Sequence, residues 1–358
     1  MVVSSPHTQD IKIELIAKTP FAGSGPRGID VYARLLGAEL SRIHPLTHIQ
    51  LSRDRSVASN PDLVHYTFFD LFFTTLWGHT PQCPFAVTIH DVIPLRFPAH
   101  FPFGLRGKFK LWLQKRALSH ASAVITDSAS SKRDIQTYLN IQPDKIHVIP
   151  LAAGHRQATI ALTKTVKQEY GLPDRFILYV GDINWNKNIP GLIKAFASLP
   201  SRRTHLVLVG KAFVTDQTSP ESRAIKDAIA QSGKSELIHT LGFVPGHHLG
   251  ALYRLATLYV QPSWYEGFGF PILEALTQGT PVLSSNQGSL PEVGGEHIHY
   301  FDPHDDKSFA DSLHELLAHP ARRSIFIESG RRWASQFTWS KVAAATYAIY
   351  AQILAAHS

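Results

Sequence analysis

The chain of 358 residues is 44% apolar and 18% charged, with a formal net charge of +7 and one cysteine. This length and composition are typical of a globular protein with two domains and exclude an intrinsically disordered chain. The lone Cys83 excludes an internal disulfide and a cysteine-rich metal site, and no stretch approaches the roughly 18 apolar residues that cross a bilayer.

Positive charge is concentrated in the first part of the sequence. Residues 1–157 hold 17 lysines and arginines against 11 acidic residues, whereas residues 158–358 hold 18 against 17. This imbalance favours an anionic partner, either a membrane surface or a phosphorylated acceptor, and no nucleic-acid-binding motif accompanies it. Residues 1–20 lack a basic start followed by an apolar run, so we expect a cytoplasmic protein without a signal peptide.

Short β-rich segments alternate with helical patterns from the start of the chain. The first strand is expected at residues 11–17, and the glycine-rich loop 23–28 opens a helix that reaches Leu40. Ser128 is expected to cap a helix that begins near Ala129. Further strands are expected at residues 48–51, 63–68, 85–90, 123–126 and 146–151. Strands spaced by helices predict a parallel sheet with helices on both faces.

The second half repeats this architecture without repeating the sequence. Strands are expected at residues 176–180, 205–209, 237–241, 258–260, 282–285 and 299–301, and helices near residues 190–198, 221–231 and 249–255. Residues 152–172 fit neither pattern and are the best candidate for a linker, and a final helix is expected near residues 340–354. We therefore predict an α/β protein with two Rossmann-like domains, residues 1–157 and 158–338, followed by a C-terminal helix in residues 339–358.

The most informative stretch is residues 258–293. A buried strand and a glycine-broken loop lead to Pro271 at the first turn of a helix, and Gly279 caps the end of that helix. Ligands of such a βαβ unit bind at the carboxyl ends of the strands. Glu266 and Glu274 bracket the helix start, whose unpaired N–H groups attract phosphate. This layout suits a ligand with a central diphosphate and a polyhydroxy group at each end, and two exposed surface charges are the alternative interpretation.

This stretch resembles the signature of the retaining GT-B glycosyltransferases called family 4, in which two glutamates separated by seven residues stand in the phrase E-G-F-G-x-P-x-x-E-A. The matching residues are Glu266, Gly267, Phe268, Gly269, Phe270, Pro271, Ile272, Leu273, Glu274 and Ala275. The resemblance implies the GT-B fold, in which two Rossmann-like domains with parallel sheets face each other across a central cleft. It also implies an N-terminal acceptor domain, a C-terminal nucleotide-sugar donor domain and a last helix that crosses back to the N-terminal domain.

Several residues of the second domain are candidates for donor binding. Glu274 would accept hydrogen bonds from the ribose, Glu266 would contact the transferred sugar, and the resemblance gives Lys187 the diphosphate. Relatives add an arginine near this lysine, but Asp182 and Asn186 stand at those positions here. Lys211 is a candidate replacement, with a solvated surface residue as the alternative. The remaining candidates lie in the loop before the helix and in a turn near the nucleotide base: Gly267, Phe268, Gly269, Phe270, Gly242, Phe243 and Val244.

In the first domain, His90 stands at the expected carboxyl end of a strand and is followed by Asp91. This phrase resembles the His-Asp of family-4 mannosyltransferases. The resemblance implies that His90 is catalytic together with Glu266, either contacting the transferred sugar or stabilising charge in the transition state. Asp91 is expected to hold local structure. The glycine-rich loop supplies candidates for contacts with acceptor or phosphate, namely Gly25, Arg27 and Gly28.

We expect a retaining, metal-independent hexosyltransferase that uses a nucleotide-diphosphate sugar, with GDP-mannose favoured, and a glycan or lipid-linked acceptor in surface polysaccharide synthesis. No cofactor is expected beyond the donor substrate, and no Asp-x-Asp metal motif stands at a strand end. The alternatives are a UDP-sugar-dependent transferase, a GT-B sugar-nucleotide epimerase and a non-catalytic sugar-nucleotide binder. A dinucleotide-dependent oxidoreductase fails on spacing, because no G-x-G-x-x-G is present and no acidic residue ends the next strand.

Residues 96–116 predict a surface that contacts an anionic membrane. No carboxylate occurs between Asp91 and Asp127, and basic residues are interleaved with aromatic ones. A helix over residues 104–119 would lie peripherally on the inner face of the cytoplasmic membrane. The alternative is an ordinary surface helix whose aromatic side chains are buried in the core. The residues concerned are Arg96, Arg106, Lys108, Lys110, Lys115 and Arg116, with Phe97, Phe101, Phe103, Phe109 and Trp112.

Overall fold

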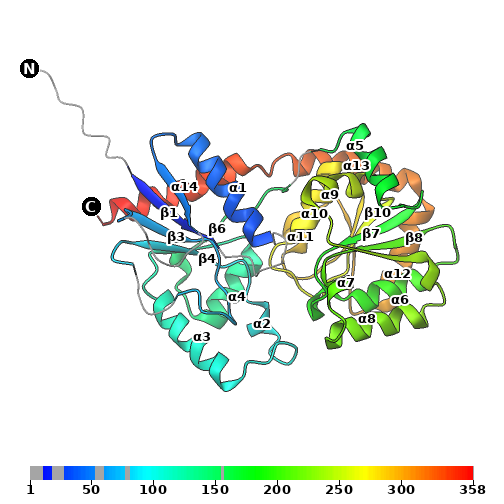
Figure 1. The fold of residues 1–358 in the computed structure, drawn as a ribbon, viewed down its shortest axis with the longest axis horizontal. Helices are drawn as coiled ribbons and strands as arrows, with labels where there is room; N and C mark the ends of the chain where they lie inside the picture. Colours follow the sequence, from blue (N-terminus) through cyan, green and yellow to red (C-terminus); the bar gives the residue numbers. More distant parts are fainter. Residues whose placement is uncertain (1–10, 18–27, 53–59, 77–80, 155–156, 358) are drawn as a thin grey trace, which may run out of the picture. The chain divides into compact units, whose positions relative to one another are not determined.

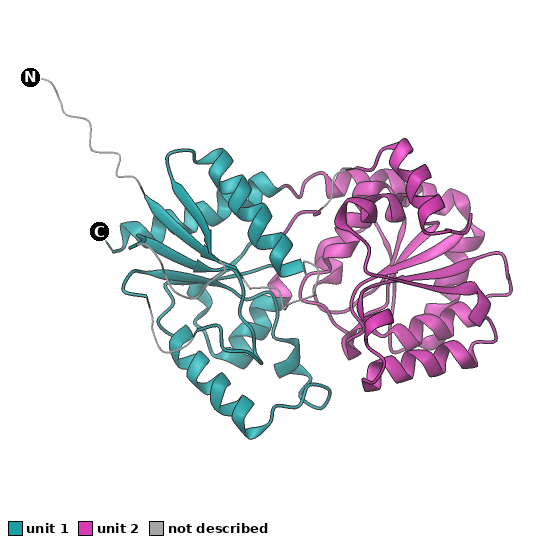
Figure 2. Ribbon diagram, in the orientation of Figure 1, with its two compact units in different colours: residues 1–127, 131–150, 339–358 teal, residues 128–130, 151–338 magenta. Residues whose placement is uncertain are grey.

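The computed structural model describes residues 11–17, 28–52, 60–76, 81–154 and 157–357. The chain divides into two compact units (Figure 2). Unit 1 comprises residues 1–127, 131–150 and 339–358, and unit 2 comprises residues 128–130 and 151–338. The division falls after Pro150, whereas the sequence placed it after Gln157. The C-terminal helix α14 (Trp339–Ala355) is grouped with unit 1.

Within its described residues, unit 1 contains a six-stranded parallel sheet with the order β2-β1-β3-β4-β5-β6. The strands are β1 (Lys12–Ile16), β2 (His48–Ser52), β3 (Leu63–Tyr66), β4 (Phe85–Thr88), β5 (Ala123–Thr126) and β6 (Ile146–Val148). Every residue of β3, β4 and β5 is buried, as expected of strands covered by helices on both sides. Figure 1 shows α1 (Gly28–Ile43) and α14 on one face, and α3 (Leu105–Leu118) and α4 (Ala129–Leu139) on the other.

Helix α14 is joined to unit 1 by packing against α1 and by its tyrosines. Tyr350 OH lies 2.5 Å from Nδ1 of His65 on β3, and Tyr347 OH lies 3.2 Å from Oγ1 of Thr47. The Tyr347 ring stacks on the ring of His44 with their centroids 3.5 Å apart. Burial lowers the pKa of His65 to about 3, so this ring is neutral inside the domain.

The described part of unit 2 contains a second six-stranded parallel sheet, with the order β12-β11-β10-β7-β8-β9. The strands are β7 (Phe176–Val180), β8 (His205–Val209), β9 (Ile238–Gly242), β10 (Leu258–Gln261), β11 (Val282–Ser285) and β12 (His299–Phe301). Figure 1 shows two layers of helices around this sheet. One layer holds α5 (Ile160–Glu169), α9 (Gly246–Leu255), α10 (Phe270–Gln278) and α13 (Pro320–Ala334), and the other holds α6 (Ile189–Ala197), α8 (Pro220–Gln231) and α12 (Asp306–Ala318). The predicted fold class, with two parallel α/β sheets, is confirmed.

A helix occupies much of the segment that the sequence analysis identified as a linker. Thr159 caps α5, since its Oγ1 accepts a hydrogen bond from the backbone N–H of Leu162 at 3.2 Å. The buried residues of α5 are Thr163 and Val166. This narrow buried stripe is too weak an apolar pattern for a sequence-based helix prediction.

The strand order of unit 2 reverses between β7 and β10. The chain passes from β7 to β8 and β9 on one side, and β10, β11 and β12 then follow on the other side. Ligands of open parallel sheets bind outside the carboxyl ends of the strands at such a reversal. The segments that follow β7 and β10 contain Lys187 and Glu266. The topology therefore brings these two predicted site residues to one place.

Candidate active site

Lys187 and Glu266 form an ion pair at the reversal of strand order in unit 2. Nζ of Lys187 lies 2.8 Å from Oε1 and 2.9 Å from Oε2 of Glu266. The Lys187 side chain is 21% exposed and that of Glu266 is 9% exposed, so water screens the pair only in part. The two residues to which the sequence assigned diphosphate and sugar are therefore in direct contact.

Asparagines join the loop after β7 to the loop after β10. Asn186 Nδ2 donates to the carbonyl of Tyr265 at 3.0 Å, and Asn188 Nδ2 donates to the carbonyl of Pro262 at 3.1 Å. The backbone N–H of Trp264 donates to the Asn186 carbonyl at 2.8 Å. Asn188 has a φ of 50°, a left-handed conformation that asparagine tolerates better than most residues. Asn186, which stands where relatives have a basic residue, is thus buried and structural.

Glu266 receives hydrogen bonds from neutral donors as well as from Lys187. Gln261 Nε2 donates to Oε1 at 2.9 Å, and Ser263 Oγ donates to the same oxygen at 2.7 Å. Burying a carboxylate is costly unless it is paired and hydrogen-bonded, and Glu266 meets both conditions. The carboxylate is therefore held in one orientation.

Glu274 lies on α10 and is only 5% exposed. Tyr253 OH donates to its Oε2 at 2.9 Å, and a Cβ built on Gly154 would lie 3.2 Å from its Oε1. The alternative of an exposed helix charge is wrong for this residue. Helix α10 begins after Gly269, whose φ of +97° favours glycine, and ends at Gly279 with a φ of +76°, the cap that the sequence predicted.

The other donor-binding candidates lie at the carboxyl edge of the same sheet. Lys211 follows β8, and Gly242 ends β9 with its carbonyl accepting from the N–H of Gly210 at 2.9 Å. Phe243 is 49% exposed, whereas Val244 is buried. The loop before α10 consists of buried residues, which are Gly267, Phe268 and Gly269, and the half-buried Phe270 opens the helix.

In unit 1, His90 forms a hydrogen-bonded pair with Asp127. Nδ1 of His90 lies 2.6 Å from Oδ2 of Asp127, and the ring meets the edge of Tyr32 with centroids 5.0 Å apart. Burial opposes the charged imidazolium, but the charge and hydrogen bond of Asp127 outweigh it, so the pKa of His90 lies above its ordinary value. Within the described part of the chain, Nε2 of His90 and Oδ1 of Asp127 have no hydrogen-bond partner.

Asp127 is the residue that the sequence analysis missed. It follows β5 as His90 follows β4, and these two strands are neighbours in the sheet. Because carboxyl ends of adjacent parallel strands lie side by side, the predicted strand ends would have paired the two residues had the order of the strands been known. Asp91 has the structural role expected of it, since its Oδ1 accepts from the N–H of Ile93 at 3.0 Å, at the start of α2 (Ile93–Arg96).

The glycine-rich loop provides little further information. Gly25 and Arg27 lie outside the described residues. Gly28 is the first residue of α1, and a Cβ added there would meet nothing within 4 Å. The described structure therefore gives no steric reason for a glycine at this position.

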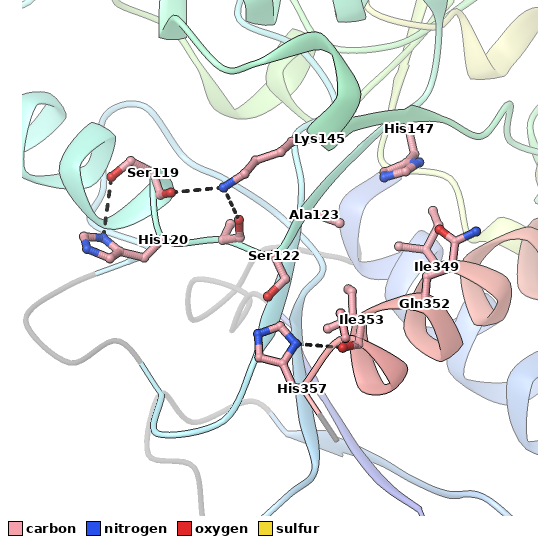
Figure 3. Close-up of a pocket in the computed structure, with 12 residues that line it drawn as sticks. Ser119, His120, Ser122, Ala123, Lys145, His147, Ile349, Gln352, Ile353 and His357 are labelled. Carbon is pink, nitrogen blue, oxygen red and sulfur yellow. Dashed lines mark hydrogen bonds between the residues drawn. The ribbon is translucent and has the colours of Figure 1, made fainter.

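A separate cavity of about 380 Å³ lies in unit 1 (Figure 3). Figure 3 shows Lys145 and Ser122 at one side of it and Gln352 and Ile353 of α14 at the other. The Lys145 Nζ donates to the carbonyl of Ala121 at 3.2 Å. Ser122 directly precedes β5 and Lys145 directly precedes β6, whereas His90 and Asp127 follow β4 and β5. The cavity therefore lies at the opposite edge of the sheet and does not belong to the candidate site.

Comparison with known proteins identifies both halves of the chain. The family model described as Glycosyl transferases group 1 matches residues 163–333, and the model described as Glycosyltransferase Family 4 matches residues 7–153. The chain is 31% identical over 311 residues to the serotype-specific mannosyltransferase WbdA of Escherichia coli. This aligned region covers 82% of this chain and 37% of WbdA. It is also 31% identical over 271 residues to the O-antigen chain mannosyltransferase B of Escherichia coli, covering 74% of this chain and 69% of that protein.

The chain thus spans little more than a third of the length of WbdA. Among solved structures, sucrose-phosphate synthase from Thermosynechococcus elongatus superposes with a TM-score of 0.76 at 20% identity, covering 97% of this chain and 100% of that one. This likeness shows a shared fold. Together with the sequence matches over both units, it establishes that the chain has the GT-B fold and belongs to glycosyltransferase family 4.

Proposed function

We propose that this glycosyltransferase moves a hexose, with mannose favoured, from a nucleotide-diphosphate sugar to a glycan or lipid-linked acceptor in surface polysaccharide synthesis, with retention of configuration. The observation that carries the proposal is the Lys187–Glu266 pair at the reversal of strand order, beside the start of α10 and the buried Glu274. Mannose and its usual carrier GDP are favoured because two relatives are named mannosyltransferases.

The donor would be held by unit 2 in three parts. Glu274 accepts from the ribose hydroxyls, and the N–H groups at the start of α10 and the Lys187 ammonium face the diphosphate. Glu266 accepts from hydroxyls of the transferred sugar. In this arrangement the diphosphate takes over Lys187 from Glu266, so one charge-assisted contact replaces another.

The chemistry would be a transfer in which the bond between the anomeric carbon and the phosphate oxygen breaks. A bond from that carbon to the acceptor oxygen forms on the same face of the sugar. The acceptor proton passes to the departing phosphate, and the cations and N–H groups around it stabilise its charge. Glu266 is already an acceptor for Lys187, Gln261 and Ser263, which supports a binding role rather than that of a covalent nucleophile.

His90 would contact the transferred sugar through Nε2. Because Asp127 accepts from Nδ1, that nitrogen is fixed, and the buried Nε2, which has no hydrogen-bond partner among the described residues, is the ring nitrogen left to bind the sugar. The raised pKa of His90 favours the imidazolium, whose charge suits the developing negative charge of the leaving group.

The test is a transfer assay with GDP-mannose and UDP-glucose as donors, combined with thermal unfolding. The favoured donor should raise the unfolding temperature, since it binds only the folded protein, and transfer should persist in a metal chelator. Stabilisation by UDP-glucose alone would move the UDP-sugar alternative ahead. Conversion of the donor sugar without an acceptor would identify an epimerase.

The proposal includes peripheral contact with an anionic membrane through residues 96–116. Leu105, Phe109 and Trp112 of α3 are 86%, 60% and 56% exposed. Their spacing places them on one face of the helix, and the rings of Phe109 and Trp112 stack with centroids 6.0 Å apart. Arg106, Lys108 and Arg116 are exposed on the same helix, which has no acidic residue.

The opposite face of α3 is anchored in unit 1. Gln114 is fully buried and accepts from the N–H of Thr75 at 2.6 Å, and Lys115 donates to the carbonyl of Tyr138 at 2.6 Å. Phe103 packs against the core of unit 1, so the alternative of buried aromatics holds for this residue. An apolar ridge with basic neighbours is suited to an anionic lipid surface. Among the helices that the structure describes, none has the length and apolarity to cross a bilayer.

Flotation with phosphatidylglycerol and phosphatidylcholine vesicles tests this contact. The protein should float with the anionic vesicles at low salt, and a Phe109→Ser/Trp112→Ser double variant should bind about tenfold more weakly or worse. Ile325→Ser, at a residue that is 68% exposed on α13, is the matched control and should bind normally. Equal loss in the control, or no binding to anionic vesicles, would contradict the membrane contact.

A further inference from the structure

Gln261 is the last residue of β10, and its buried side chain lies against Glu266. Its Nε2 donates to Glu266 Oε1 at 2.9 Å and to Ser263 Oγ at 2.8 Å, and Ser263 Oγ in turn donates to the same Oε1 at 2.7 Å. Oε1 therefore accepts from Gln261 and Ser263 as well as from Lys187 at 2.8 Å, while Oε2 is contacted by Lys187 at 2.9 Å.

The orientation of the Gln261 amide is set by Tyr259. The Tyr259 hydroxyl donates to Gln261 Oε1 at 2.5 Å. Burial raises the pKa of this tyrosine well above its ordinary value, so its hydroxyl stays a donor. A flipped amide would turn its oxygen towards the Glu266 carboxylate and leave two acceptors facing each other. Tyr259 therefore keeps the Gln261 amino group on the carboxylate.

A second buried tyrosine makes the corresponding contact to the other glutamate. Tyr253 donates to Glu274 Oε2 at 2.9 Å, and its ring meets the Tyr259 ring with centroids 5.4 Å apart. Tyr253 thus donates directly to Glu274, whereas Tyr259 acts on Glu266 through the amide of Gln261.

We infer that Gln261, oriented by Tyr259, is a positioning residue that fixes Oε1 of Glu266 so that Oε2 is presented to the transferred sugar. This inference rests on the proposed role of Glu266 in sugar binding. When Lys187 turns to the diphosphate, both oxygens lose the ammonium group, but Oε1 keeps the donors Gln261 and Ser263. The carboxylate then cannot rotate away from the sugar without losing two hydrogen bonds.

The test compares Gln261→Met, Tyr259→Phe and Tyr253→Phe with the wild type, measuring kcat with the donor and nucleoside diphosphate affinity by calorimetry. Gln261→Met keeps the length of the side chain and removes its amide, and it should lower kcat by about tenfold to a hundredfold with little change in affinity. Tyr259→Phe should lower kcat less, and it should add nothing in a Gln261→Met background, because it acts through the amide. Tyr253→Phe, the matched control, should weaken nucleotide binding and spare kcat.

Thermal unfolding checks that each variant folds. If Gln261→Met keeps wild-type kcat, or if the two tyrosine variants change kcat and affinity alike, the inference is overturned and Gln261 is a core residue only. Glu266→Gln separates the two possible failures. Full turnover in Glu266→Gln overturns the proposed sugar contact itself, whereas loss there without loss in Gln261→Met overturns only the positioning role.

Discussion

The Lys187–Glu266 pair of unit 2 and the His90–Asp127 pair of unit 1 both follow the ends of parallel strands, but they differ in how many of their polar atoms have partners. Both oxygens of Glu266 accept hydrogen bonds from other side chains, and the Lys187 ammonium group donates to both of them. In the part of the chain that the structure describes, Nε2 of His90 and Oδ1 of Asp127 have no hydrogen-bond partner. One pair must exchange partners to bind a ligand, whereas the other can gain a partner without losing one.

This difference implies that mutation should affect the two sites differently. If Lys187 or Glu266 is removed, the other member of this fully hydrogen-bonded pair can bind a new partner. Part of the lost binding energy is therefore offset. Removing His90 takes away the side chain whose Nε2 has no other partner among the described residues of unit 1. We therefore expect the largest effect on turnover in unit 1 and the larger effects on nucleotide affinity in unit 2.

His90→Ala should give the largest effect, a fall in kcat of about 10²–10³-fold, the range seen when one stabilising donor is lost from an active site. Nucleoside diphosphate affinity should stay near the wild-type value, because the nucleotide is assigned to unit 2. The control is His147→Ala, at a half-buried histidine beside the cavity at the other edge of the sheet. A small effect of His90→Ala would show that the unpaired Nε2 has no role in turnover.

Glu274→Ala should weaken nucleoside diphosphate binding by roughly 1.5–3 kcal/mol, the value of a charge-assisted hydrogen bond, which is about tenfold to a hundredfold in affinity. Calorimetry with the ribonucleoside and 2′-deoxynucleoside diphosphates isolates the ribose contact. The wild type should prefer the ribose form, and the variant should lose this preference. An unchanged preference would contradict the contact between Glu274 and the ribose.

Lys187→Ala should have a smaller net effect on diphosphate binding, about tenfold, because the wild-type lysine must first leave Glu266. The nucleoside without phosphates should bind the variant and the wild type alike. If both ligands weaken equally, Lys187 supports the fold of the loop, and Lys211 becomes the first alternative for the phosphate contact.

The smallest effect concerns the stability of unit 1 as a function of pH. The pKa of His90 is raised in the folded state by Asp127, so its stabilising contribution is complete below the unfolded pKa of about 6.5 and is lost as pH rises through the folded pKa. The difference in unfolding temperature between wild type and Asp127→Asn should therefore shrink as the pH rises from about 6.5 through the folded pKa of His90. A difference that does not change with pH would mean that His90 stays neutral.

The sequence predicted most of the fold because the strands are short buried runs with the residue types of β-strands. It also indicated Glu266, Glu274, Lys187 and His90 as candidate site residues, because their surroundings match a known phrase or a strand end. It did not predict that Lys187 bonds to Glu266, because these residues lie far apart in the chain and meet only through the order of the strands. The polar helix α5 was missed because its buried stripe is narrow, and Asp127 was missed because its partner lies on a neighbouring strand.

Helix α14 has a consequence for the order in which the molecule folds during synthesis. Unit 1 is completed by residues 339–358, with Tyr350 bonded to His65 inside it. A ribosome releases this helix only after all of unit 2 has been made. The donor-binding half can therefore fold as a unit while the half that precedes it in the chain still lacks one of its covering helices. Until α14 has been made, one face of the sheet of unit 1 is incompletely covered. At this stage of synthesis the protein is most open to proteases and most dependent on chaperones.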